Sequence, residues 1–121
     1  MFKGKKGTNI NPHAMMKAQE LLEAATSTFE RREFTAEVDG VKVVLSGKRE
    51  LLSVDSGSDS VSKDLLMKAY EMANHELTHE RHLTLVRIRN QVTKEFRVDI
   101  KGAVPDVAEA VAYMDKRQSA S

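Results

Sequence analysis

The sequence predicts a small α+β protein: a helix, a three-stranded antiparallel meander and a long helix, followed by a C-terminal extension. Two changes in the spacing of apolar residues indicate this order. Helical spacing in the first 32 residues gives way to alternation over 33–55, and helical spacing then returns. At 121 residues the chain suits one domain with a modest core. We expect a flexible basic arm over 1–11, an α-β-β-β-α domain over 12–83, and a charged extension over 84–121 with a short terminal helix.

The first helix is expected from about residue 12 to residue 32. Asn11 can cap it, and Pro12 suits the first helical position because proline has no N–H to satisfy there. Apolar residues recur along it at spacings of three and four, namely Met15, Ala18, Leu22, Ala25 and Phe29. Such a narrow stripe resembles a coiled-coil seam, so this helix gains by packing on a partner.

Three strands are expected next, in "EFTAEV" (33–38), "VKVVLSG" (41–47) and "ELLSVD" (50–55). The Asp39-Gly40 pair between the first two is a strong signal for a two-residue hairpin. Alternation puts Val41, Val43 and Leu45 on one face of the sheet, with Lys42 and Val44 on the other. A polar loop, "SGSDSVS" at 56–62, then leads toward a helix cap.

A second helix is expected to begin near Ser62 or Lys63. One apolar face runs to Leu77, and a second stripe, rotated to nearly the opposite side, begins at Leu85 and ends at Phe96. Three interpretations stay open for this region: one long helix that changes partners, a break near residue 83, or strands in "LVRIR" and "EFRVDI". Gly102 and Pro105 then interrupt, and "PDVAEAVAYMDKR" predicts a short amphipathic helix.

The charges almost balance, at a net +1, but they are unevenly distributed. The first 19 residues hold four lysines and no acid, residues 50–80 are acidic, and bases return over 81–101. Such clusters can create local positive fields that attract a polyanion, although solvated faces without a partner explain them equally well. The chain has no cysteine, and no apolar run approaches the ~18 residues that a membrane span needs. We therefore expect a cytoplasmic protein.

One short motif resembles a catalytic site. His75-Glu76-Leu77-Thr78-His79 has the HExxH pattern, in which two histidines bind zinc and the glutamate activates water. No third ligand follows at the usual spacing. At ~100° per residue, His75, His79 and His82 fall within about 60° of each other at the edge of the apolar stripe. They could hold an adventitious ion. We expect no resident metal or other cofactor, no small-molecule substrate and no enzyme activity.

The order and spacing of several segments resemble the YbaB/EbfC-type nucleoid-associated proteins. The matching segments are "MMKAQELL" at 15–22, "VKVVLSGKRELLSVD" at 41–55 and "DLLMKAYEMANHE" at 64–76. Together they cover about residues 12–83. The chain departs from the family in its short hairpin at Asp39-Gly40, in Glu71 and Met72 where an asparagine is common, and in its charged extension.

The resemblance implies an intertwined or tweezers-like homodimer that binds double-stranded DNA in the bacterial nucleoid with little sequence preference. Residues of the apolar stripe and the sheet are candidates for the dimer interface: Met15, Leu22, Phe29, Val43 and Leu45. Non-specific DNA binding needs cations that reach phosphates. The candidates are Lys3, Lys5, Lys6, Lys17, Arg31, Arg32, Lys48, Arg49, Arg87 and Arg89.

Two other functions are weighed against DNA binding. The first is a dimeric protein-interaction adaptor, in which the acidic 50–80 face and the C-terminal helix dock another protein. The second is a small HExxH zinc hydrolase, which the missing third ligand disfavours. With no tryptophan and six other aromatic residues, the chain also has little means of stacking on single-stranded bases.

Overall fold

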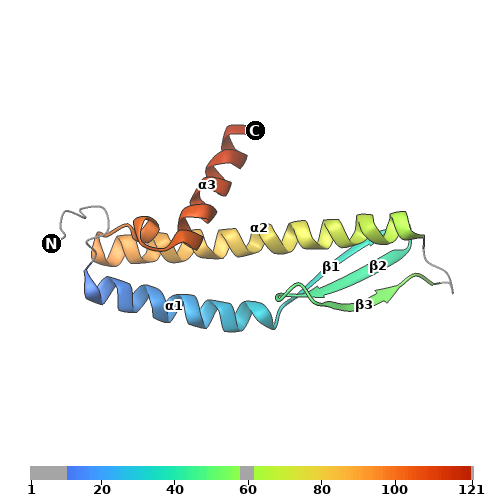
Figure 1. The fold of residues 1–121 in the computed structure, drawn as a ribbon, viewed down its shortest axis with the longest axis horizontal. Helices are drawn as coiled ribbons and strands as arrows, with labels where there is room; N and C mark the ends of the chain where they lie inside the picture. Colours follow the sequence, from blue (N-terminus) through green and yellow to red (C-terminus); the bar gives the residue numbers. More distant parts are fainter. Residues whose placement is uncertain (1–10, 58–61, 121) are drawn as a thin grey trace. The chain divides into compact units, whose positions relative to one another are not determined.

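The structure of the protein is a computed structural model that describes residues 11–57 and 62–120. The elements, labelled in Figure 1, are α1 (Pro12–Glu30), β1 (Glu33–Val38), β2 (Val41–Ser46), β3 (Leu51–Asp55), α2 (Lys63–Phe96), the 3-10 turn η2 (Ile100–Gly102) and α3 (Pro105–Ala120). This order confirms the predicted α+β fold of the single chain. The expected arm, apart from Asn11, and residues 58–61 of the polar loop lie outside the described residues.

The chain forms two compact units, each with its own apolar core. The first, residues 26–80, contains the strands and is called the sheet unit below. The second, residues 1–25 and 81–121, is called the helical unit. Both α1 and α2 contribute to both units, and residue 83, the expected end of the central domain, lies inside α2.

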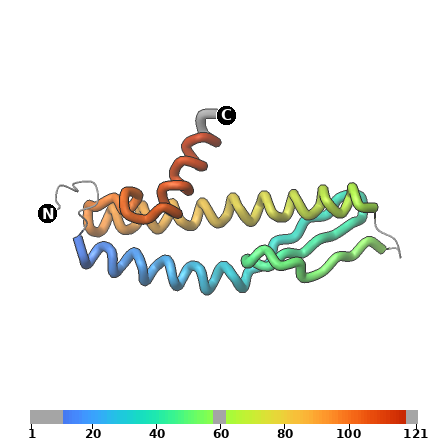
Figure 2. The backbone as a smooth tube through the Cα atoms, in the orientation of Figure 1, coloured from blue at the N-terminus to red at the C-terminus, as the bar shows by residue number. Residues whose placement is uncertain are grey.

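The sheet unit is an antiparallel meander in the order β1-β2-β3 with the first half of α2 against one face, as Figure 2 traces. Val41, Val43 and Leu45 are buried, whereas Lys42 is exposed and Val44 is half-buried, so the predicted alternation is confirmed. The β1–β2 turn has the expected geometry, because Asp39 (φ 48°) and Gly40 (φ 85°) both adopt the left-handed conformation of a tight hairpin. The core of the unit comprises Phe29, Phe34, Ala36, Val43, Leu45, Ala69, Ala73 and Leu77.

The β2–β3 turn packs against the end of α1. The N–H of Gly47 donates to the carbonyl of Arg32 at 3.1 Å, and the side-chain oxygen of Ser46 accepts the N–H groups of Lys48 and Glu50. A Cβ on Gly47 would lie 1.9 Å from the carbonyl oxygen of Phe29, so only glycine fits. This turn therefore fixes where Lys48 and Arg49 lie relative to α1.

The second helix is continuous from Lys63 to Phe96, so the alternatives of a break near residue 83 and of strands in "LVRIR" and "EFRVDI" are wrong. Buried positions continue through the doubtful stretch at Leu77, His82, Leu85 and Ile88, and this packing sustains the helix where its apolar face turns. The helix begins as predicted, with the N–H of Leu66 donating to the carbonyl of Ser62 at 2.9 Å.

The helical unit is built from three helical segments and a turn. Its fully or nearly buried core residues come from α1, α2, η2 and α3: Ala14, Ala18, Ile88, Val92, Ile100 and Val107. The side chain of Asn11 accepts the N–H of His13 at 2.8 Å, which confirms the predicted cap of α1, although α1 ends at Glu30 and not at residue 32. Within residues 11–57 and 62–120, no helix combines the length and hydrophobicity that crossing a bilayer requires.

Candidate nucleic-acid interface

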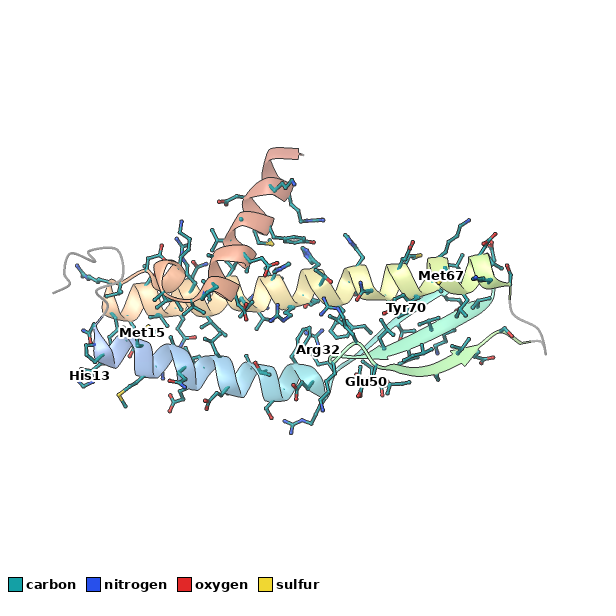
Figure 3. All side chains as sticks on the ribbon, viewed as in Figure 1. His13, Met15, Arg32, Glu50, Met67 and Tyr70 are labelled. Atoms are coloured by element: carbon teal, nitrogen blue, oxygen red, sulfur yellow. The ribbon has the colours of Figure 1, made fainter. Side chains whose placement is uncertain are left out.

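Two of the candidate cations have structural roles in the sheet unit. Arg32, labelled in Figure 3, lies over the rings of Phe29 and Phe34, at 5.8 and 5.0 Å from their centroids, and pairs with Glu80 at 3.5 Å. Arg49 has a left-handed backbone (φ 68°) and donates to Asn74 and Thr78 of α2, both at 2.9 Å. These contacts tie the sheet to α2 and leave fewer N–H groups for an outside phosphate.

Arg89 is also engaged within the chain. Its guanidinium donates to both carboxylate oxygens of Asp99, at 2.8 and 3.1 Å. That hydrogen bonding, more than any other interaction, raises the pKa of Arg89 above its ordinary value and lowers the pKa of Asp99 to about 2. Lys17 has a weaker contact, to Glu20 one turn along α1 at 3.6 Å. Of these two, Arg89 is the less available to DNA.

Three candidate cations remain open to solvent. Arg31, Lys48 and Arg87 are exposed, and none of them forms an ion pair with another described residue. Lys3, Lys5 and Lys6 lie outside the described residues. By sequence they precede Asn11 by at most eight residues, which limits their distance from it to about 28 Å of extended chain.

The structure adds candidate phosphate-binding cations that were not predicted from the sequence. Lys94 lies seven residues after Arg87 on α2, so the two share a helix face about 10 Å apart along the axis, with exposed Gln91 between them. Arg97 and Lys101, just beyond α2, are also exposed. The signal that could have identified them is the return of bases over 81–101, read with a helical period to its end at Phe96.

Opposite net charges distinguish the two units. The helical unit has twelve lysines and arginines against seven acids, a net +5, whereas the sheet unit has seven against eleven, a net −4. Candidate cations of the sheet unit therefore lie among excess carboxylates, and those of the helical unit do not. Because phosphate attraction follows the local field, the helical unit is the better polyanion surface.

The five residues predicted for the dimer interface pack within the protomer instead. Phe29, Val43 and Leu45 are buried in the core of the sheet unit, and Met15 and Leu22 pack on the core of the helical unit. Apolar surface is left open elsewhere, on β3. All five β3 residues are exposed, including Leu51 (51%) and Val54 (37%).

Register explains why these β3 side chains are apolar. Leu51 pairs with Leu45, and Val54 pairs with Val43, so both lie on the face that α2 covers over β2. The bulge between these pairs leaves Leu52 as the extra residue. Met67 of α2 is also exposed, and Tyr70, one turn further on, packs at the edge of the core; both are labelled in Figure 3. The apolar face of the sheet thus extends beyond the helix that covers it.

The three histidines have different surroundings. His75 is exposed, His79 is half-buried and His82 is buried, with its ring 4.2 Å from that of Tyr113 in α3. Among the described residues, no three His, Asp, Glu or Cys side chains are grouped to hold a metal ion. The packing of His82 on Tyr113 gives this histidine a structural role between α2 and α3.

No family model matches the chain, and no curated protein matches it.

Proposed function

We propose that the protein is a homodimeric, nucleoid-associated protein of bacteria that binds double-stranded DNA through lysine and arginine contacts to phosphates, with little sequence preference. The observation that carries the proposal is the excess of positive charge in the helical unit, where Arg87 and Lys94 stand exposed on one face of α2. The resemblance to YbaB/EbfC-type proteins supports it, because their helix, three-stranded meander and helix occur here in the same order.

Phosphate binding needs cations but no particular base-reading geometry. A row of long, flexible cations with an intervening amide, as in Arg87, Gln91 and Lys94, suits the sugar–phosphate backbone of any sequence. The arm lysines add charge to the same unit. Each phosphate neutralised releases counterions, so the affinity falls steeply with salt.

A second copy of the chain would cover the open apolar face of the sheet. Leu51, Val54 and Met67 leave hydrophobic area in water, and β3, which has no further strand beside it in the part of the chain that the structure describes, leaves backbone groups unpaired at the sheet edge. Pairing two copies removes both costs and doubles the number of cations per particle. Weak phosphate contacts in two copies then combine on one duplex or bridge two.

Titration of duplexes of unrelated sequence with the wild-type protein tests the proposal. We expect dissociation constants that agree within a few-fold between sequences and that rise steeply between about 50 and 300 mM salt. Absence of binding at the lowest salt would rule DNA binding out.

A protein-interaction adaptor is the second candidate, and the open apolar strip of β3 in an acidic unit favours it. Reversing the charge of the arm, Lys3→Glu with Lys5→Glu and Lys6→Glu, separates the two functions. DNA binding weakens in this variant, whereas an adaptor that docks through the sheet unit keeps its partner.

A further inference from the structure

The segment after α2 places its acids on arginines of α2. Asp99 holds Arg89 through two hydrogen bonds, and Asp106, at the start of α3, lies 3.5 Å from Arg81. Asp115 of α3 adds to the negative potential around Arg89. All these residues belong to the helical unit. The pairing therefore lies within one compact unit and involves two arginines, Arg81 and Arg89, of the basic region.

The geometry at Arg89 is the one by which arginine recognises phosphate. Two parallel N–H···O bonds to a planar or tetrahedral oxyanion are stronger and more directional than a lysine contact. Arg81 and Arg89 are eight residues apart, about 12 Å along the axis of α2 and ~80° apart in helical rotation, while the phosphates of one DNA strand recur every ~3.4 Å along the duplex axis. They lie on a different face of α2 from Arg87 and Lys94, because 81 and 87 differ by ~240° in helical rotation.

The contacts that hold this segment are of unequal strength. Val107 and Ala110 of α3 are fully buried, and Tyr113 stacks on His82. The two ion pairs lie outside this core and differ from each other: 40% and 61% of the Arg81 and Asp106 side chains are exposed, against 28% and 39% for Arg89 and Asp99, which share two hydrogen bonds. An exposed single contact such as Arg81–Asp106 contributes little to stability, whereas the bidentate Arg89–Asp99 pair is the stronger of the two. A polyanion can therefore compete for the arginines without first breaking the apolar core.

We propose that Arg81 and Arg89 form a second phosphate-binding row, which Asp106 and Asp99 of the C-terminal segment occupy as internal substitutes for phosphate. The proposal rests on the proposed DNA binding and adds a control to it. In the resting protein the row is neutralised, and DNA binds through the arm and the Arg87–Lys94 face. When the acids are displaced, the row adds up to two phosphate contacts per protomer.

The test compares two variants that change the net charge equally. Asp99→Asn with Asp106→Asn releases the row, and asparagine at 99 retains an oxygen that can cap η2. Glu95→Gln with Glu109→Gln is the matched control, because both glutamates are exposed in the helical unit and form no ion pair with a described residue. Affinity for a mixed-sequence duplex is measured for both variants and the wild type across about 50–300 mM salt.

We expect the released variant to bind at least about tenfold more tightly than the control near 100 mM salt, with a salt slope steeper by roughly 1.8 per protomer. Adding Arg81→Gln and Arg89→Gln to the released variant restores the wild-type net charge without the row, so it should return both values to those of the wild type. Equal affinity and slope in the released variant and the control would overturn the internal row and leave DNA binding intact. No binding by the wild type, the control and the released variant would overturn both proposals. Binding by the released variant alone would support the row and overturn the proposal that the wild-type protein binds DNA.

A second measurement uses the wild-type chain, so it does not depend on the folding of a variant. The guanidinium N–H resonances of Arg89 in the NMR spectrum should shift when saturating duplex is added, because phosphate oxygens replace those of Asp99 as acceptors. Resonances that stay unchanged with DNA bound would contradict displacement of Asp99.

Discussion

At the scale of single residues, Gly47 is a position that a larger residue cannot occupy unless the backbone moves. It brings the β2–β3 turn against the backbone of Phe29, and the N–H of Gly47 itself donates to Arg32. Its role differs from that of Gly57, which has a left-handed φ of 70° but has open space where a Cβ would lie. One glycine is required by close approach, the other by backbone conformation.

Gly47→Ala should lower the free energy of unfolding by about 3 kcal/mol or more, because the clash is with backbone and cannot be relieved by a side-chain rotation. Gly57→Ala should cost only about 1 kcal/mol, the strain of a left-handed residue with a Cβ. Chemical denaturation of both variants measures the difference. Equal losses would show that the turn can move away from α1.

The Arg89–Asp99 pair predicts an acid-dependent contribution to stability. The pKa of Asp99 in the folded protein is about 2, below the ordinary value of about 3.9, so the folded state binds this proton less readily than the unfolded state. The contribution is present above pH ~4 and is lost as the pH falls toward about 2. It is modest, because 39% of the Asp99 side chain is exposed.

Thermal unfolding of the wild type and Asp99→Asn across this range checks the prediction. The melting temperatures should differ most near neutral pH and converge as the wild type becomes protonated. A constant difference down to pH ~2 would mean that the ion pair has no part in the stability of the helical unit.

At the scale of elements, α2 contributes to both apolar cores, whereas β3 is left partly uncovered. The apolar face of α2 turns as it passes from Ala73 and Leu77 of the sheet unit to Ile88 and Val92 of the helical unit, and the helix stays continuous because both units bury it. Over the sheet, α2 is too narrow to cover β3. The outer strand therefore keeps an apolar strip that the protomer alone does not bury.

Leu51→Glu with Val54→Glu should prevent the proposed dimerisation through β3, since charges in this strip would have to be buried unpaired in that interface. Sedimentation equilibrium measures the change. Met16→Glu is the control, because Met16 is a still more exposed hydrophobic residue, in the helical unit. Loss of dimer in the control, or a dimer that survives in the β3 variant, would assign self-association to another surface.

At the scale of the whole molecule, the division of charge matters more than the total. A net +1 suggests no preference for polyanions, yet the two units differ by nine charges, from +5 to −4. Under the proposed DNA binding, the acidic unit would repel a duplex and the basic unit would attract it, so the helical unit is the expected contact.

Arg87→Gln with Lys94→Gln should therefore weaken duplex binding about tenfold near 100 mM salt and reduce the salt slope by roughly 1.8 per protomer. Lys42→Gln with Lys63→Gln removes the same charge from exposed positions of the sheet unit and should have a much smaller effect. Equal effects of the two pairs in a fluorescence anisotropy titration would mean that only net charge governs binding.

The sequence by itself determined the elements. Strands β1 to β3 and the starts of α1 and α2 agree with the predicted ranges to within one residue, because a period of two or of 3.6 and the Asp39-Gly40 turn are local properties. The stretch over 83–96 has a helical stripe of its own but also alternates in part, and an apolar face that turns resembles a break until its partners are known.

Only the tertiary structure decided which side chains are available for function. Arg49 and Thr78 are 29 residues apart, Arg32 and Glu80 are 48 apart, and Arg81 meets Asp106 across 25. Leu51 and Leu45 share a sheet face, yet only Leu45 is covered by α2. The sequence shows where a cation or an apolar residue occurs, but whether its side chain is available to a partner depends on the neighbours that folding brings together. Availability to a partner is a property of those long-range contacts, and no local period encodes it.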